Sequence, residues 1–238
     1  MLGVKLNKME LRGIVGLESK IKVLAHQYLI IRKAIQGLSL MSKHLEKNGY
    51  PVEIAEPYRR MLVEVRKALE REMNGLVINH PAYYKYLQYL DGIGPTISAL
   101  IIGLIQPRRF ATISKMWKYL GLTPESRRQK GENAGYNVKA KTVVYTAVSN
   151  MLMKGSIYKK IYENFKAEER EKHPELRRAH IHMRAMRKTM KLFTAHYWTA
   201  YRRILGLPVS KPYAHAILGH KDYVDVLVDK PKPGIWRG

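Results

Sequence analysis

The chain has 238 residues, and its 43 Lys and Arg against 19 Asp and Glu give a formal net charge of +24. Self-repulsion at this charge disfavours a free metabolic enzyme and favours a polyanionic partner. The absence of cysteine excludes disulfides and thiolate metal sites. Nucleic acid is the expected partner, and an anionic membrane surface is the alternative. No apolar run approaches the ~20 residues of a membrane span, and the N-terminus has no signal-peptide hydrophobic region. We therefore expect no membrane partner and a cytoplasmic, nucleoid-associated location.

Two heptad-spaced apolar stripes occupy the first third of the chain. The first runs through Leu17, Ile21, Leu24, Tyr28, Ile31, Ile35, Leu38 and Leu45. The second runs through Tyr58, Leu62, Val65, Leu69, Met73 and Leu76. Alternating four- and three-residue spacing is typical of a coiled-coil seam, and Asn48-Gly49-Tyr50-Pro51 between the stripes has turn chemistry. The pattern predicts an antiparallel helical hairpin over residues 1–80.

Further apolar residues flank the first seam, at Val23, Leu29, Ile30, Leu40 and Met41. An isolated hairpin would leave these side chains in water. We expect them to contribute to a homodimer interface. The alternative is that they pack against the rest of the same chain.

Residues 89–102 have the pattern of the second half of a helix-hairpin-helix. Pro95 suits the first turn of a helix, where its missing N–H costs nothing. Gly92 and Gly94 are expected to make a tight turn in which a side chain would clash or be forced to positive φ. Turn amides at a helix N-terminus can hold a phosphate, so we expect Gly92, Gly94 and Thr96 to contact nucleic acid. The alternative is a plain helical corner.

Basic residues follow this motif, both in a segment with a core-like apolar pattern and in a polar loop. The loop, residues 124–138, contains glycine and has no periodicity, and such loops carry function when a rigid scaffold holds them. The candidate phosphate contacts in these two segments are Arg108, Arg109, Lys115, Lys118, Arg127, Arg128 and Lys130.

A last long helix is expected over about residues 174–205. One of its stripes is apolar, and another at the same spacing is basic, through Arg177, His180, Arg184, Arg187 and Lys191. No acidic residue lies between Leu176 and Thr194, whereas a solvated surface helix normally mixes signs. We expect this one-signed face to contact a phosphate backbone. A merely solvated basic face is the alternative.

Three ordered segments resemble the C-terminal transposase domain of the DEDD-type, bridge-RNA-guided insertion-sequence transposases. They are Leu90-Asp91-Gly92-Ile93-Gly94-Pro95, Arg109-Phe110 and Lys118-Tyr119-Leu120-Gly121-Leu122-Thr123-Pro124. Residues 179–185 also resemble the downstream helix of many members, so the resemblance covers about residues 87–207. It implies a DNA-binding recombinase domain preceded by a coiled coil, with RNA as a further possible partner.

The chain departs from that family in two respects. Members begin with a RuvC-like domain whose acidic residues hold metal ions, and nothing in this sequence matches it. The family also places a catalytic serine just before a glycine, where this chain has Gln129-Lys130-Gly131. A lysine cannot form the phosphoester intermediate that a serine nucleophile forms with DNA. We expect the chemistry to be lost, and the alternative is that Ser126 serves as the nucleophile.

Histidines give a weak metal signal. His180 and His182 are two residues apart on a helix and point away from each other. His215 and His220 have no cysteine to complete a site. We expect no metal and no cofactor.

These patterns predict an all-α protein. Residues 1–80 form a helical hairpin, residues 81–207 a compact helix-hairpin-helix domain, and residues 208–238 a Pro-containing arm. The expected function is backbone binding to duplex or branched DNA, with little base readout and without catalysis, by a protein of transposase descent. Three alternatives stay open: a recombinase subunit that uses Ser126 with a nuclease partner, an RNA-binding protein, and a chromatin-type architectural protein.

Overall fold

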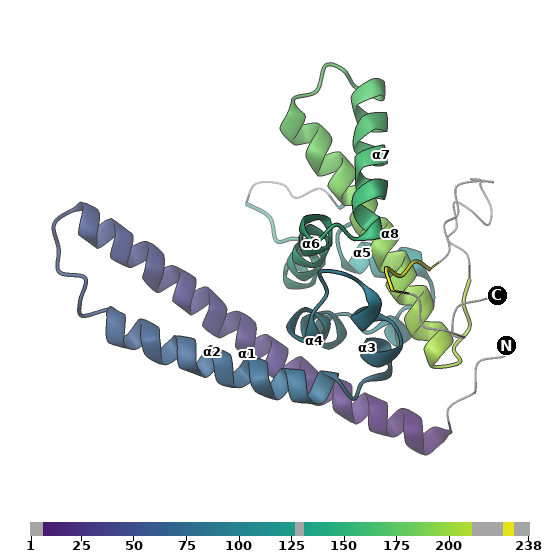
Figure 1. The fold of residues 1–238 in the computed structure, drawn as a ribbon, viewed down its shortest axis with the longest axis horizontal. Helices are drawn as coiled ribbons and strands as arrows, with labels where there is room; N and C mark the ends of the chain where they lie inside the picture. The colour runs from purple at the N-terminus through teal and green to yellow at the C-terminus, as the bar shows by residue number, and fades with distance from the viewer. Residues whose placement is uncertain (1–6, 127–130, 211–225, 231–238) are drawn as a thin grey trace.

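The computed structural model describes residues 7–126, 131–210 and 226–230, and all regular structure among them is helical (Figure 1). The all-α class is therefore confirmed. The elements in chain order are α1 (Lys8–Lys47), α2 (Glu56–Val77), α3 (Pro81–Lys85), the 3-10 turn η1 (Leu87–Tyr89), α4 (Pro95–Leu104), the 3-10 turn η2 (Pro107–Arg109), α5 (Ile113–Tyr119), α6 (Val138–Met153), α7 (Ile157–Lys172) and α8 (Arg178–Ile204). None of the described helices combines the length and apolar character that a membrane span needs.

The helix α1 starts at a complete capping box. The Asn7 side chain accepts hydrogen bonds from the backbone N–H groups of Met9 and Glu10, and the Glu10 carboxylate accepts from the Asn7 N–H at 2.8 Å. The 40 residues of α1 span about 60 Å at 1.5 Å per residue. Gly49, with φ +73°, then lets the chain reverse. The helix α2 runs back along α1, and the pair projects from the rest of the molecule (Figure 1).

The seam predicted for α1 is confirmed. Ile21, Leu24 and Tyr28 are buried, and the seam residues Ile31, Ile35, Leu38 and Leu45 are intermediate in exposure. The predicted α2 stripe is wrong at two positions, because Tyr58 and Val65 are 61% and 41% exposed.

The residues that follow these two positions in α2, Arg59 and Arg66, are the less exposed ones. Both arginines are intermediate in exposure, so their aliphatic stems can cover the seam while their guanidinium groups reach carboxylates. Arg59 Nε donates to Glu56 at 2.7 Å, and Arg66 Nε lies 4.0 Å from Glu70. The predicted stripe was built from apolar residues alone, and it therefore did not include these amphipathic arginine side chains.

The base of the hairpin shares one hydrophobic core with the helices that follow. Ala25 of α1 and Met73 of α2 belong to the same buried cluster as Leu100 and Ile101 of α4. The backbones of α1 and α4 approach closely at Gly103, where a Cβ would lie 3.1 Å from the Ala25 Cβ. The hairpin is therefore anchored through its base, while its outer half extends into solvent (Figure 1).

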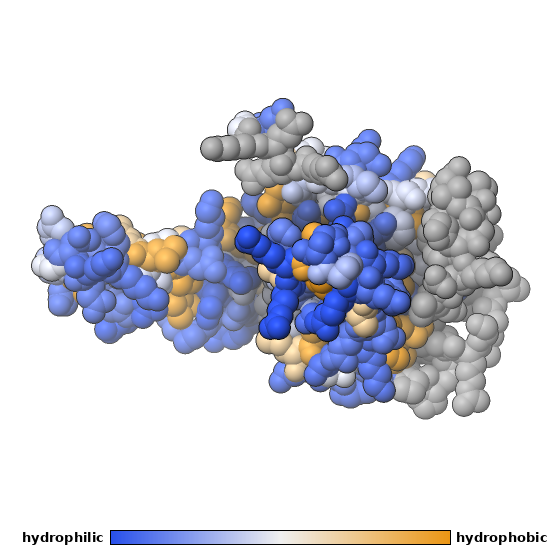
Figure 2. All heavy atoms as spheres, turned by 90° about the horizontal axis from the view of Figure 1, so that it is seen from above, coloured by the Kyte–Doolittle hydropathy of each residue, from blue (hydrophilic) through white to orange (hydrophobic). Residues whose placement is uncertain are grey.

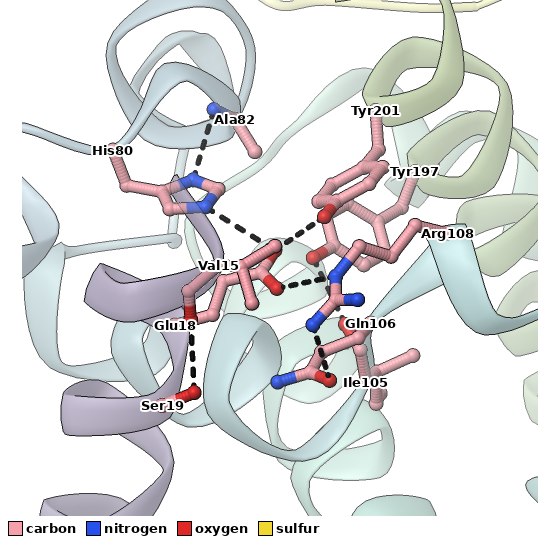
Figure 3. A network of polar contacts seen from close by, with 10 residues as sticks. All are labelled: Val15, Glu18, Ser19, His80, Ala82, Ile105, Gln106, Arg108, Tyr197 and Tyr201. Carbon is pink, nitrogen blue, oxygen red and sulfur yellow. Dashed lines mark hydrogen bonds and ion pairs between the residues drawn. The ribbon is translucent and has the colours of Figure 1, made fainter. Parts of the chain in front are cut away.

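A buried carboxylate joins α1 to three later elements (Figure 3). Glu18 is fully buried. Its carboxylate accepts from Arg108 Nε of η2 at 2.8 Å and from the Tyr201 hydroxyl of α8, and it lies 3.4 Å from His80 Nε2. His80 Nδ1 accepts from the Ala82 N–H at 3.1 Å, so the ring proton sits on Nε2 and faces Glu18. The Arg108 prediction is corrected here, because this guanidinium serves an internal ion pair.

These contacts keep Glu18 ionised inside the protein. Burial alone would raise the pKa of this carboxyl, but hydrogen bonds from His80, Tyr201 and Arg108 outweigh it and lower the pKa. Replacing either the carboxylate or one of its donors destabilises the fold, because the remaining groups would be buried without partners.

We expect Glu18→Ala to lower the free energy of unfolding by about 3–5 kcal/mol, since the substitution leaves three polar partners unsatisfied. Urea unfolding followed by circular dichroism measures the change. Glu46→Ala, at an exposed site on the same helix, should change stability by about 0.5 kcal/mol or less. Equal effects of the two substitutions would contradict the role of Glu18.

Candidate nucleic-acid interface

A tight turn at residues 121–126 follows α5. Gly121 has φ +64°, and a Cβ there would lie 2.5 Å from the Tyr136 ring, so the turn requires glycine at this position. The Ser126 N–H donates to the Thr123 carbonyl at 3.1 Å, and the two hydroxyl oxygens are 2.8 Å apart. The hydroxyl of Ser126 is therefore part of the turn's own hydrogen bonding.

Two cations from different helices hold the turn. Lys141 of α6 donates from Nζ to the Gly121 carbonyl at 2.9 Å. Arg187 of α8 donates to the Leu122 carbonyl at 3.4 Å and also to the Thr123 carbonyl. Carbonyl oxygens are neutral, so these bonds position the two side chains without cancelling their charges.

Two more lysines lie beside the same turn. Lys191 Nζ is 4.4 Å from the centroid of the Trp117 ring. Burial lowers the pKa of Lys191, as does the charge of Arg187, whereas Glu125 opposes them. The pKa of Glu125 is lowered by hydrogen bonds from its own backbone and from Thr123, and further by the charges of Lys118 and Arg187.

We call this cluster the basic turn. It consists of residues 121–126 with Lys118, Lys141, Arg187 and Lys191. Four basic side chains from α5, α6 and α8 thus gather around this turn, and the charges of Lys118, Arg187 and Lys191 interact with the carboxylate of Glu125. Lys118, Arg187 and Lys191 were predicted as phosphate contacts, and the fold brings them together. Lys141 was missed, because only the tertiary structure places it beside the turn.

The basic stripe of α8 is not one-signed in three dimensions. Arg184 pairs with Glu169 of α7 and donates to His173 Nε2 at 3.0 Å. Lys188 lies 2.7 Å from Glu169 and 3.4 Å from Glu168. The helix α7 therefore supplies the acidic groups that the α8 sequence lacks. The expectation for Arg184 as a free phosphate contact is corrected by this ion pair.

The remaining basic candidates differ in their surroundings. Arg109, Lys115 and Lys118 are exposed, and no ion pair forms to them within the described part of the chain. Arg177 and His180 are exposed at the start of α8. Seen from the side on which α7 projects, hydrophilic side chains dominate the helical body, while apolar patches also show on the hairpin (Figure 2). Three candidates lie outside the described residues: Arg127, Arg128 and Lys130.

In the glycine turn before α4, Gly92 has the positive φ and the crowding that were predicted, whereas Gly94 has neither. Gly92 has φ +91°, and a Cβ there would lie 2.6 Å from the Asn150 carbonyl oxygen. Gly94 has φ −87°, is exposed and has open space around the Cβ position. Gly94 is the N-cap of α4, and a side chain there is not excluded by sterics. The Thr96 hydroxyl donates to the Asn74 side chain at 3.1 Å.

A carboxylate of the same chain already binds beside this glycine turn. Asp229 accepts from the Asp91 N–H at 2.8 Å, from the Ser156 hydroxyl at 2.8 Å and from the Ile157 N–H at 2.6 Å. It thereby caps the N-terminus of α7. An internal carboxylate thus binds the Asp91 N–H, next to the predicted phosphate cradle. Packing of Gly92 on Asn150, near the end of α6, also separates this turn from the basic turn, which contacts the start of α6.

The histidines that gave a weak metal signal in the sequence include His182, which contacts a tyrosine. His182 Nδ1 lies 2.6 Å from the Tyr162 hydroxyl. No group of three His, Asp or Glu side chains suited to a metal ion occurs in residues 7–126, 131–210 and 226–230. His215 and His220 lie outside these ranges.

Comparison with protein-family models gave no match to this chain, and no curated protein matches it significantly. The residues of the site are therefore what bears on function.

We expect the Glu169 ion pairs to make stability depend on acid pH. Burial alone would raise the pKa of Glu169, but Lys188 and Arg184 outweigh it and hold the pKa at about 2, below the usual 4.5. The lowered pKa means that the stabilisation is present above pH 4.5 and disappears as the pH falls toward 2. Glu169→Gln should cost about 1.5–3 kcal/mol at neutral pH.

Urea unfolding across the acid range measures this difference between the Glu169→Gln variant and the native chain. The difference should shrink as the pH falls below 4.5. Glu171→Gln, which removes an exposed carboxylate of the same helix, is the control and should show no such trend. A pH-independent cost of Glu169→Gln would show that the ion pairs do not stabilise the fold.

Proposed function

We propose that the chain is a nucleic-acid-binding protein of transposase descent, and that the basic turn contacts the phosphate backbone of duplex or branched DNA. The observation that carries this proposal is the gathering of Lys118, Lys141, Arg187 and Lys191 around the turn at residues 121–126. The formal charge of +24 provides the long-range attraction. Lysine and arginine contacts to phosphate carry no sequence information, so binding is expected to be insensitive to base sequence.

The positions of the cations support backbone contact rather than base readout. Lys141 and Arg187 are held by carbonyl oxygens of the turn, which fixes their charges in place before a ligand arrives. Preorganised charge lowers the entropic cost of binding. The resemblance favours DNA, and RNA presents the same phosphates.

We propose binding without catalysis. A serine nucleophile needs an adjacent base or a charge that activates it, and the Ser126 hydroxyl is instead engaged with Thr123. A recombinase that uses Ser126 is the second candidate, favoured by the positive charge of Arg187 and Lys118 beside the same turn. A covalent protein–DNA adduct that depends on Ser126 would distinguish the recombinase from the binding protein.

We expect the double substitution Lys115→Gln and Lys118→Gln to weaken binding similarly for unrelated duplex sequences. Both lysines are exposed on α5, three residues apart on one face, so the fold should be preserved. The slope of log affinity against log salt should flatten by ~0.9 for each phosphate that the variant no longer neutralises. Fluorescence anisotropy titrations at several salt concentrations measure the slope.

The matched control is Lys43→Gln with Lys47→Gln, which removes the same charge from exposed sites on the hairpin. Its salt slope should stay close to that of the native chain. If the affinity of both double variants falls equally, total charge rather than the basic turn governs binding.

We also propose that two copies of the chain pair through one face of the hairpin. Along α2, the exposed apolar residues Tyr58, Met61 and Val65 each precede an inward-facing residue. The helix α1 has exposed small or apolar residues in the matching positions: Ile30, Ala34, Gly37 and Met41. In an antiparallel pair, the positions that precede the seam on the two helices lie on the same side. The two stripes therefore combine into one apolar face.

A second copy fits this face in spacing and in charge. Heptad spacing suits a helical partner with the same period, as in a four-helix bundle, and a two-fold axis would bring identical patches together. Residues 30–80, which contain both stripes, hold six acidic and nine basic side chains, whereas the whole chain carries +24. Charge repulsion between two copies is therefore weaker here than elsewhere on the protein.

We expect Met61→Glu with Val65→Glu to convert a dimer into a monomer, because each charge would be buried without a partner in the paired face. Light scattering should give twice the 27.6 kDa chain mass for the native protein and the single mass for the variant. Met153→Glu, at a 75% exposed methionine of α6, should leave the dimer intact. A native chain that is monomeric at tens of micromolar would exclude this pairing.

A further inference from the structure

A groove between α6 and α8 opens beside the basic turn and is lined by apolar side chains. Met186 and Met190 of α8 line it and are buried, at 2% and 4% exposure. Met183 of α8 and Tyr145 of α6 also line it, but they are 52% and 37% exposed. These side chains form one apolar groove, and apolar grooves with a few polar groups at their edge are typical of ligand-binding surfaces.

Three basic side chains line the same groove: Lys141, Arg184 and Arg187. Arg184 is paired with Glu169, whereas the donors of Lys141 and Arg187 meet carbonyl oxygens of the basic turn. No carboxylate of the described chain lies within ion-pair distance of either side chain. The groove therefore joins an apolar surface with an aromatic ring to two positive charges that have no ion-pair partner among the described residues.

We infer that this groove takes a single unpaired nucleobase, with the adjoining phosphate near Lys141 and Arg187. The inference rests on the proposed nucleic-acid binding and deepens it. A nucleobase is flat, and its faces stack on aromatic side chains such as that of Tyr145. The soft thioether of Met183 can adapt to the ring, and each nucleotide brings the phosphate that the two cations require.

The geometry selects an unpaired base over a paired one. In a duplex, both faces of each base are covered by its stacked neighbours, and a base must leave the stack to enter a protein pocket. Bulges, junctions and single strands supply such bases at the lowest energetic cost. The groove therefore gives the protein a preference for branched or interrupted nucleic acid over a continuous duplex.

The test compares three DNA probes of the same sequence: a fully paired duplex, a duplex with one bulged 2-aminopurine, and a duplex with one abasic bulge. The native chain should bind the 2-aminopurine bulge about tenfold more tightly than the other two probes, and binding should quench the 2-aminopurine emission. Tyr145→Ala and Met183→Ala should remove this advantage while leaving the affinity for the paired duplex within about twofold. Met153→Ala, outside the groove, should behave as the native chain.

The outcomes separate the two proposals. Equal affinity for the two bulged probes would overturn the nucleobase site while leaving backbone binding in place. Failure to bind any of the three probes would overturn both. If a fluorescent fatty acid binds and Tyr145→Ala abolishes that binding, while the two bulges bind equally, the groove takes an apolar anion and the inference is wrong.

Discussion

The buried carboxylate of Glu18 is the interaction on which the arrangement of the helices depends. It joins α1 to η2 and α8 through Arg108 and Tyr201, and it faces the ring of His80 at the start of α3. Desolvation of a charge is costly unless geometry and hydrogen bonds compensate for it. The need to keep these contacts therefore restricts how α1, α3, η2 and α8 can be placed relative to one another. The position of α8 in turn determines where Arg187 and Lys191 lie, and therefore where positive charge gathers around the turn at residues 121–126.

The sequence predicted those features that depend on local spacing. The heptad stripe of α1, the start of α4 at Pro95 and the positive φ of Gly92 each follow from period or backbone sterics. Features that depend on a distant partner were not predictable. Nothing near Arg184 in sequence indicates that Glu169 would neutralise it, and nothing near Arg108 indicates Glu18. The rotation of α2 was missed for a related reason, because the aliphatic stems of Arg59 and Arg66 occupy positions that a purely apolar pattern assigns to Tyr58 and Val65.

The same limit applies to the candidate site. The lysines and arginines could be named from the sequence, but their number overstates the free charge, since several are paired with carboxylates. What distinguishes the basic turn is that Lys141 and Arg187 have neutral partners and keep their charge. The glycine turn before α4 has the opposite character, because the carboxylate of Asp229 occupies the Asp91 N–H. On this account the two proposed roles lie in different regions: a smaller net charge and apolar stripes on the hairpin suit a second copy, and positive charge near α5, α6 and α8 suits phosphate.

Lysine acetylation footprinting, read by mass spectrometry with and without a short DNA duplex, tests the central claim most directly because it needs no substitution. If the basic turn holds the phosphate backbone, DNA should slow acetylation of Lys118 and Lys141, and of Lys115 one helical turn before Lys118, and leave Lys43 and Lys47 of the hairpin unchanged. Uniform protection of all these lysines would indicate unspecific attraction by net charge. Protection confined to Lys154, Lys159 and Lys160, at the end of α6 and the start of α7 near the glycine turn, would contradict the assignment of the interface to the basic turn.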